Sequence, residues 1–343
     1  MGNNYLDLLN SLEKKAPQTR NSHVMFVDCM NMFIRGFAMI PAINPQGQPV
    51  GGLVGFLRSL NYTTRHVQPT RVVLVFDGIG AKTNRQNIDA DYKGTRGMKR
   101  ITNWDFYDNH NQEKASFSSQ MDRLIDYLHQ LPVDLISVDK QEADDIIAIL
   151  AKKQEAAGNL STIVSSDKDY LQLLSDKIKV YAPIKKKMYD VQNFTEEVGI
   201  LPKNFIYYKA LLGDNSDNIP GVKGLGPKTL KKIFPKLSTE VVEDGLDYVF
   251  DECERNFEGK KIYATILERA ERVQMNYQLM DLHNIELLPR DMEYVMGVFD
   301  NPNSNLNIYS FIKMVDDDQL DGHFTKNTEG WLEHFRFLTQ QKG

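Results

Sequence analysis

Four short apolar runs, each followed within a few residues by an aspartate, constrain the fold of this chain more than any other feature. All four are rich in β-branched residues, and they cover residues 24–27, 72–76, 135–138 and 162–164. Continuous apolar strands are typical of a parallel sheet that is covered on both faces. The segments between them, such as 53–66 and 117–130, have helical character. This alternation predicts an α/β fold with a mostly parallel central sheet and right-handed crossovers.

The acidic residues that follow these runs predict one shared site. Ligands of open α/β sheets bind outside the carboxyl ends of the strands, so carboxylates far apart in the sequence would meet there. The acids concerned are Asp28, Asp77, Asp139, Glu142, Asp144, Asp145, Asp167 and Asp169, joined further on by Asp214 and Asp217. So many carboxylates in one crevice would repel one another strongly unless they were protonated or bound to a metal. Their number therefore indicates a metal site.

Oxygen ligands alone indicate magnesium or manganese rather than zinc. Carboxylates without His or Cys suit hard ions such as Mg²⁺ and Mn²⁺, and no Cys or His pair has zinc-ligand spacing. Two such ions about 4 Å apart can activate water and stabilise both oxygens of an in-line phosphodiester displacement. Taken alone, Glu142, Asp144 and Asp145 are better explained as a helix start, with Asp139 and Glu142 as a capping box. Together with the other acids they indicate a two-metal nuclease centre.

Composition and charge distribution bear on partners and location. Lys and Arg number 41 against 46 Asp and Glu, and the formal net charge of -5 argues at first against a nucleic-acid partner. The basic residues are clustered, however, within residues 93–100, 185–187 and 223–236, which form local cationic surfaces. The longest apolar stretch, residues 24–40, is interrupted by polar residues and matches neither a membrane span nor a signal peptide. With two cysteines, the chain is expected to be cytoplasmic and to lack a disulfide framework.

A second, mostly helical region is expected after residue 192. From there the apolar pattern changes to helical periodicity with interspersed lysines. The predicted organisation is a polar lead-in over 1–20, an α/β domain over 21–192 and a helical domain over 193–343. Near the end of the chain, an amphipathic helix is marked by Trp331, Leu332, Phe335 and Leu338. Its apolar face either packs on its own domain, which is the usual outcome, or docks on a sliding clamp or a single-strand-binding protein.

Residues 221–230 look like a nucleotide-binding loop but are better explained as the turn of a helix-hairpin-helix. Their sequence is Gly-Val-Lys-Gly-Leu-Gly-Pro-Lys-Thr-Leu, and Pro227 between Gly226 and Lys228 breaks the P-loop pattern. Glycines permit the tight turn, and proline suits the first helical position. Backbone amides at such a helix start, with lysines nearby, bind the phosphates of a duplex without recognising its sequence.

Six short motifs follow one another between residues 28 and 234. They are Asp28 with Asn31, Phe76-Asp77-Gly78, Asp91-Tyr92-Lys93 with Arg96, Glu142-Ala143-Asp144-Asp145, Ser166-Asp167-Lys168-Asp169 and Gly213-Asp214-Asn215-Ser216-Asp217-Asn218. Each motif alone is weak, but this series closely resembles the flap endonuclease family. That family includes the 5′-nuclease domain of bacterial DNA polymerase I and the phage 5′-3′ exonucleases also called ribonuclease H. The resemblance implies a PIN-like 5′-nuclease domain followed by a helical region with a helix-three-turn-helix module at about 205–237.

The resemblance also implies that two Mg²⁺ ions, for which Mn²⁺ can substitute, are held by the acids. The first ion would be held mainly by Asp28, Asp77, Glu142 and Asp144. The second would be held by Asp145, Asp167, Asp169 and Asp217, with Asp214 in an outer position. Waters and bridging ligands blur this division.

DNA contacts are a further implication of the resemblance. Lys93 and Arg96 match residues that contact the reacting phosphate, at the start of a flexible helical arch over about 93–118 that admits a single 5′ strand. Tyr92, Lys99 and Arg100 are additional candidates, although a solvated, charged helix explains the last two better. The arch also contains aromatic residues that either stack on unpaired bases or pack in the core, namely Trp104, Phe106, Tyr107 and Phe117. In the helix-three-turn-helix module, the duplex would be gripped by Gly224, Gly226, Lys228, Lys231 and Lys232, in some family members with K⁺ in the turn.

The resulting expectation is a Mg²⁺-dependent, structure-specific 5′ nuclease of DNA replication. It would act as a monomeric flap endonuclease and 5′-3′ exonuclease on 5′ flaps, nicks and gaps, and as a ribonuclease H on RNA–DNA hybrids. The compact chain resembles phage replication nucleases, which favours a phage over a bacterial origin and the cytoplasm of the infected cell as its location. Two alternatives stay open. A PIN-like ribonuclease would share the acidic crevice without needing the hairpin module, and a junction-binding protein without catalysis would be expected to lose some of the carboxylates, none of which is missing.

Overall fold

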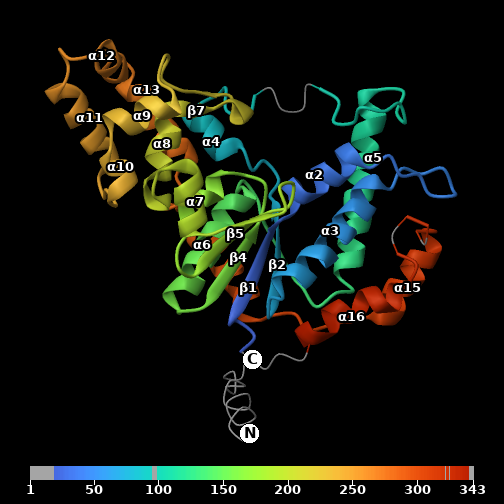
Figure 1. Ribbon diagram of the computed structural model, residues 1–343. Coiled ribbons are helices and arrows are strands. Elements are labelled where there is room, and N and C mark those ends of the chain that lie inside the picture. The colour runs from blue at the N-terminus through green and yellow to red at the C-terminus, as the bar shows by residue number, and fades with distance from the viewer. Residues whose placement is uncertain (1–18, 95–98, 321, 324, 340–343) are drawn as a thin grey trace, which may run out of the picture.

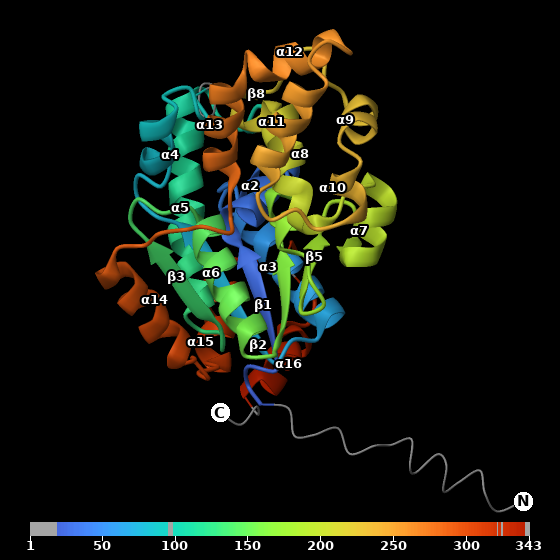
Figure 2. The ribbon, with the colours of Figure 1, turned by 90° about the vertical axis from the view of Figure 1, so that its left-hand side faces the viewer.

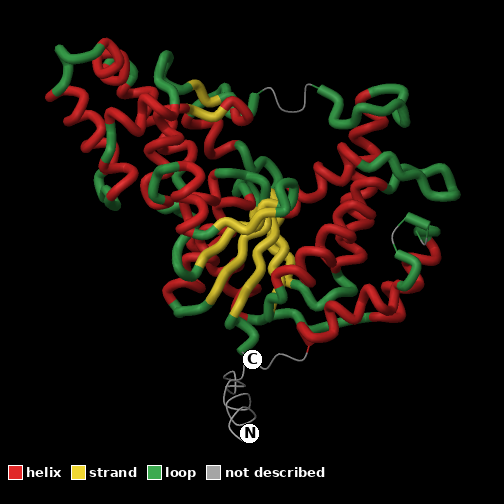
Figure 3. The backbone as a smooth tube through the Cα atoms, in the orientation of Figure 1, coloured by secondary structure: helices red, strands yellow, loops and turns green. Residues whose placement is uncertain are grey.

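A computed structural model describes the protein over residues 19–94, 99–320, 322–323 and 325–339. Its centre is a six-stranded sheet in the order β3-β2-β1-β4-β5-β6 (Figure 1). Strands β1 to β5 are parallel to one another, and β6 runs antiparallel to β5. Figure 3 shows the strands of this sheet gathered in the middle of the α/β layer with helices around them. Their bounds are His23–Asp28, Arg71–Asp77, Asp134–Val138, Leu160–Val164, Ile178–Ala182 and Lys187–Tyr189. The strands expected from the sequence are present as β1 to β4, which confirms the α/β fold with a mostly parallel sheet.

Different helices cover the two faces of the sheet. Because successive residues of a strand point to opposite faces, Met25 and Val27 of β1 belong to one hydrophobic cluster, and Val24 and Phe26 to another. The first face carries α2 (Cys29–Met39), α3 (Gly51–Val67) and α5 (His110–Leu128). The second face carries α6 (Ala143–Ala156), the 3₁₀ helix η1 (Asp169–Leu173) and α14 (Pro289–Asp300). Burial on both sides explains why the strands are continuously apolar.

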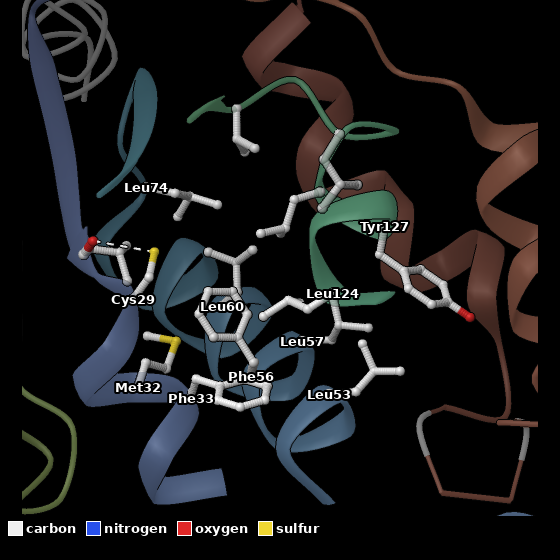
Figure 4. Close-up of a cluster of buried hydrophobic side chains, with 14 of the residues drawn as sticks. Cys29, Met32, Phe33, Leu53, Phe56, Leu57, Leu60, Leu74, Leu124 and Tyr127 are labelled. Carbon is white, nitrogen blue, oxygen red and sulfur yellow. Dashed lines mark hydrogen bonds between the residues drawn. The ribbon is translucent and has the colours of Figure 1, made fainter. Parts of the chain in front are cut away.

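Helices α2 and α3 form the centre of the first cluster, which Figure 4 shows in part. Phe33 of α2 lies beside Phe56 of α3, and Leu74 of β2 closes the cluster from the sheet side. The two helices approach each other at Gly36 and Gly55, where a Cβ on Gly55 would lie 2.7 Å from the Cα of Gly36. This close packing holds α2 in place, and the residue before its first turn is Asp28, the first of the predicted acids.

Helices α7 to α13 form a helical region at the carboxyl ends of the strands (Figure 2). Their bounds are Val191–Val198, Phe205–Leu212, Pro227–Ile233, Lys236–Thr239, Gly245–Arg255, Lys261–Leu267 and Ala270–Met280. Residues of α8 to α13 share a third hydrophobic cluster. The short strands β7 (Gly213–Asp214) and β8 (Ile219–Pro220) form a tight hairpin between α8 and α9. Gly213 has a φ of +74°, and a Cβ there would lie 2.4 Å from the carbonyl oxygen of Ile219, so this turn requires glycine.

The last three helices return to the α/β layer instead of joining the helical region. They are α14, α15 (Ile308–Asp317) and α16 (Thr328–Thr339). Phe311 of α15 stacks on Trp331 of α16, and both belong to the hydrophobic cluster of α2, α3 and α5. The expectation of one helical domain over 193–343 is therefore wrong for this last part. The apolar face of α16 is buried against its own chain, as Trp331, Leu332, Phe335 and Leu338 all lie in that cluster.

Two expectations concern the N-terminal lead-in and the absence of a membrane-spanning segment. Most of the predicted lead-in over 1–20 lies outside the described residues. Among the residues that the structure does describe, no helix combines the length and the apolar character that crossing a membrane requires.

Candidate active site

The acids at the ends of the strands are fixed by hydrogen bonds from neighbouring loops. Asp28, the last residue of β1, caps α2 by accepting from the amide of Asn31 at 3.1 Å. Its second carboxylate oxygen accepts from the hydroxyl of Ser165, which follows β4, at 2.9 Å. Asp77, the last residue of β2, accepts from the amide of Ala143 at 2.8 Å. Asp28 thus ties the carboxyl end of β1 to the loop after β4, and Asp77 ties the end of β2 to the start of α6.

Helix α6 starts later than the sequence suggested. Glu142 is the residue before its first turn, and its own side chain makes no capping hydrogen bond, so the alternative of a capping box of Asp139 and Glu142 is not formed. Released from a capping role, the Glu142 carboxylate accepts hydrogen bonds from Tyr92 Oη at 2.9 Å and from Lys93 Nζ at 2.8 Å. The acidic motif at the start of α6 therefore faces the site rather than its own helix.

Arg85 of α4 (Thr83–Ile88) was not predicted, yet its guanidinium lies in the middle of this motif. It donates to Glu142 at 2.5 Å, to Asp144 at 3.3 Å and to Asp145 at 2.8 Å, and it is 8% exposed. Its Nε donates to the carbonyl oxygen of Leu279 in α13 at 2.9 Å, which joins the acids to the helical region. Burial, followed by repulsion from Asp144, raises the pKa of Asp145 to about 7, although Arg85 opposes the shift.

Lys93 connects the two halves of the site. Its ammonium lies 2.8 Å from Glu142 and 3.8 Å from Asp217, and its own amide donates to the carbonyl oxygen of Asp217 at 2.9 Å. Tyr92, expected to contact DNA, is buried with its hydroxyl on Glu142, so the structure places it inside the acidic site. Arg96 lies outside the described residues.

Lys209 of α8 is a second cation that the sequence analysis missed. Its ammonium is buried, contacts Asp169 and lies 2.8 Å from Asp214. Burial raises the pKa of Asp169 to about 7 and the charge of Asp167 adds to the shift, while Lys209 opposes it. Burial alone would raise the pKa of Asp214, but Lys209 and Ser216 outweigh it and lower that pKa to about 2. Asp214 is thus ionised and bound to protein groups.

The remaining acids lie within electrostatic reach of one another. Burial raises the pKa of Asp28 to about 7, and the charges of Asp77 and Asp167 add to the shift. The buried phenol of Tyr170 has its pKa raised by burial and then by Asp28, Asp144, Asp167 and Asp77. Tyr170 thus lies within electrostatic reach of four of the acids.

The segment predicted as a helical arch has two parts. From residue 99 to 109 the described chain has no helix, and α5 begins at His110. Lys99 and Arg100 are exposed in the irregular part. Tyr107 and Phe117 pack on Phe37 in the first hydrophobic cluster, with ring centroids 6.1 and 5.2 Å apart, so these two aromatics belong to the core.

The predicted hairpin turn leads into α9. Gly224 has a φ of +84°, and Gly226 is the residue before the first turn of α9. Lys228 and Lys232 are exposed on this helix, where a DNA backbone can reach them. Lys231 instead turns inward and donates to a backbone carbonyl at the end of α7 at 3.0 Å.

Comparison with known proteins assigns this site to a family. A model of the 5′-3′ exonuclease N-terminal resolvase-like domain matches residues 23–199, and a model of the 5′-3′ exonuclease C-terminal SAM fold matches residues 200–296. The chain belongs to the 5′-3′ exonuclease family. It is therefore a hydrolytic nuclease, and the resemblance drawn from the six motifs is confirmed.

Comparisons with individual proteins support the same family assignment. The 5′-3′ exonuclease of Bacillus subtilis is 35% identical over 64% of this chain and 72% of its own length. That of Aquifex aeolicus is 31% identical over 75% of this chain and 81% of its own length. DNA polymerase I of Rhizobium leguminosarum is 28% identical over 88% of this chain but only 28% of the polymerase. A solved structure of the bacteriophage T5 flap endonuclease with DNA and metal ions shares the fold, with a TM-score of 0.62, 20% identity and coverage of 91% of this chain and 98% of the phage protein.

The donor chemistry of the exonuclease site suits hard divalent ions, while its side chains are held apart by internal cations. Oxygen-only ligands with mutually raised pKa values fit Mg²⁺ or Mn²⁺. Within the described part of the chain, however, no three His, Cys, Asp or Glu side chains form a ready-made metal cage. Arg85, Lys93 and Lys209 lie between the acids instead. A divalent ion would have to compete with these cations for the same oxygens.

The raised pKa of Asp28 predicts how the stability of the metal-free protein depends on pH. The folded protein keeps a proton on Asp28 up to about pH 7, whereas the unfolded chain releases it near 3.8. Unfolding therefore releases a proton between these values, and the free energy of unfolding falls as pH rises. Relative to Asp28→Asn, the native protein is expected to lose up to about 1.4 kcal/mol per pH unit between about pH 4.5 and 6.5. Urea unfolding in EDTA measures this difference, and parallel stability curves for the two proteins would contradict it.

Proposed function

We propose that this protein is a divalent-metal-dependent nuclease that cuts DNA where a duplex meets an unpaired 5′ strand. The observation that carries the proposal is the position of Lys93, whose ammonium lies 2.8 Å from Glu142 in the α/β domain and 3.8 Å from Asp217 in the helical region. Lys93 also begins the segment expected to admit the 5′ strand. The acids of the sheet, the start of the arch and the helical region with its hairpin therefore meet at one residue.

The acids would hold two Mg²⁺ ions, or Mn²⁺ in their place. One set would be Asp28, Asp77, Glu142 and Asp144. The other would be Asp145, Asp167, Asp169 and Asp217, with Asp214 outside. When bound, the ions would supply an activated water and charge stabilisation for phosphodiester hydrolysis. Lys93 and Arg96 would balance the negative charge that develops on the reacting phosphate.

The helical region would hold the duplex. The turn at Gly224 and Gly226, with Lys228 and Lys232 exposed on α9, suits a phosphate backbone and, in the turn itself, a K⁺ ion. Asp217 precedes this turn by a few residues, so anchoring the duplex also positions the phosphate at the acids. Substrates would be 5′ flaps, nicks, gaps and RNA primers of replication, and the protein would act as a monomer. Because the apolar face of α16 is buried, a clamp or single-strand-binding partner is not part of this proposal.

Cleavage of a labelled 5′-flap duplex with different metals tests the proposal. Cutting is expected to be absent in EDTA and restored by Mg²⁺ or Mn²⁺. Ca²⁺ is the comparison ion, because it takes more oxygen ligands than Mg²⁺, at longer distances and in a more flexible geometry. A matched single-stranded RNA separates the alternatives, since a PIN-like ribonuclease would cut it and a flap nuclease would not. Tight binding of the flap without cutting in any of the three metals would instead support a junction-binding protein.

A further inference from the structure

A groove beside α8 adjoins the candidate active site, and its aromatic end has no role in the function proposed above. Two cavities of about 310 and 600 Å³ form it. They share residues from the loop after β4 and from α8, namely Ser166, Asp167, Lys168, Phe205 and Tyr208. The combined space is called the α8 groove below. Because Asp167 lines both cavities, the groove opens next to one of the acids proposed to hold a metal ion.

One end of the α8 groove is aromatic and apolar. Phe205 and Tyr208 stack on each other with ring centroids 5.5 Å apart, and Tyr189 of β6 lines the same cavity. Ile184, in the turn between β5 and β6, is 64% exposed at its border. Flat rings around a cavity of this size suit a planar ligand, which can stack on them.

The groove also offers polar groups to such a ligand. Ser166 lines both cavities, and its buried hydroxyl has no hydrogen-bond partner among the residues that the structure describes. Buried hydroxyls normally have a partner, so this one indicates a ligand that supplies it. Lys168 is exposed beside the groove, and Lys185 lies at its aromatic end with its ammonium 2.9 Å from the hydroxyl of Tyr189. Glu197 lines the same cavity and lies 3.7 Å from the ammonium of Lys185, so Lys168 is the lysine that would attract a phosphate accompanying the ligand.

We propose that the α8 groove receives an unpaired nucleobase of the DNA strand whose phosphate lies at the acids. A nucleobase has two flat faces for the aromatic end and polar edge atoms for Ser166, and its own backbone would continue past Asp167 into the site. The inference rests on the proposed function, because it needs DNA at the acids. Stacking requires only a flat face, so the groove would accept each of the four bases and would fix the position of the cut rather than its sequence.

Removal of single bases tests the groove. Flap duplexes carrying one abasic nucleotide, scanned over the positions on either side of the cut, are compared with the intact flap for binding in Ca²⁺ and for cleavage in Mg²⁺. At one position the missing base is expected to weaken binding by about 5- to 100-fold. Tyr208→Leu is expected to weaken binding of the intact flap by a similar factor but to have little further effect on that abasic flap. Tyr208→Phe keeps the ring and should restore normal binding.

The control is Tyr248→Leu, which removes a half-buried tyrosine of α11 outside the groove and should affect intact and abasic flaps equally. Thermal unfolding of each variant confirms that it is folded. If the native protein cuts the intact flap and no abasic position matters, or if Tyr208→Leu and the abasic nucleotide act independently, the inference is overturned while the proposed function stands. If the native protein neither binds nor cuts the intact flap, the proposed function fails and the groove loses its ligand.

Discussion

Flap cleavage is expected to fall by at least about 1,000-fold when Asp217 is replaced by alanine (Asp217→Ala), and by a similar factor for Asp167→Ala. Each variant removes carboxylate oxygens proposed to hold an ion. Asp217→Ala also removes the acid that faces Lys93 across 3.8 Å, so the ammonium loses one of the two contacts that place it. Single-turnover cleavage of a 5′-flap duplex in Mg²⁺ measures the effect without interference from product release.

A control variant distinguishes the loss of a proposed metal ligand from the loss of one negative charge. Asp316→Asn removes an exposed acid of α15, far along the chain from the site, and should leave cleavage unchanged. Binding of the flap in Ca²⁺ should be retained by Asp167→Ala far better than cleavage in Mg²⁺ is. Cleavage by either alanine variant within a few fold of the native rate would remove both acids from the proposed metal site.

The sheet and the meeting point of the acids could be predicted because they follow from local pattern and one topological rule. Each apolar run became a parallel strand, and Asp28 and Asp77 are the last residues of β1 and β2. Their register places them at the same edge, since Asp28 pairs with Val75 and Asp77 with Val138. Hairpin glycines and proline likewise define their turn through backbone geometry alone.

The cations between the acids could not be predicted in the same way. Arg85 reaches Glu142 across 57 residues of chain, and Lys209 reaches Asp169 across 40. Such pairs depend on how α4 and α8 pack on the sheet, which no local spacing encodes. The available signal was an arginine on a short helix after β2, and in the sequence a buried arginine does not differ from an exposed one.

The return of the last helices to the α/β layer was missed for a related reason. Helical periodicity in α15 and α16 shows that one face of each is buried, but not which surface covers it. In the structure that surface is the side of α3, where Asn61 donates to the carbonyl oxygen of Trp331 at 2.9 Å. The continuous helical composition after residue 192 thus hides three destinations. Helices α8 to α13 lie at the carboxyl ends of the strands, α14 packs on the second face of the sheet, and α15 and α16 pack on the first face.

Arg85→Met is expected to lower the free energy of unfolding of the metal-free protein by about 3 to 5 kcal/mol at neutral pH, because it leaves buried carboxylates without their cation. The guanidinium contacts Glu142, Asp144 and Asp145, and methionine replaces its volume but none of its donors. At acidic pH the loss should be smaller, since the acids can take up protons instead. Saturating Mg²⁺ should also reduce the loss, because an ion that binds only the folded state stabilises it.

The control is Arg255→Met, which removes an exposed arginine paired within α11 and should lower the free energy of unfolding by less than about 1 kcal/mol. Urea unfolding in EDTA and in Mg²⁺ compares the three proteins, and equal stability of Arg85→Met and the native protein in EDTA would show that the acids do not need this arginine as their internal cation.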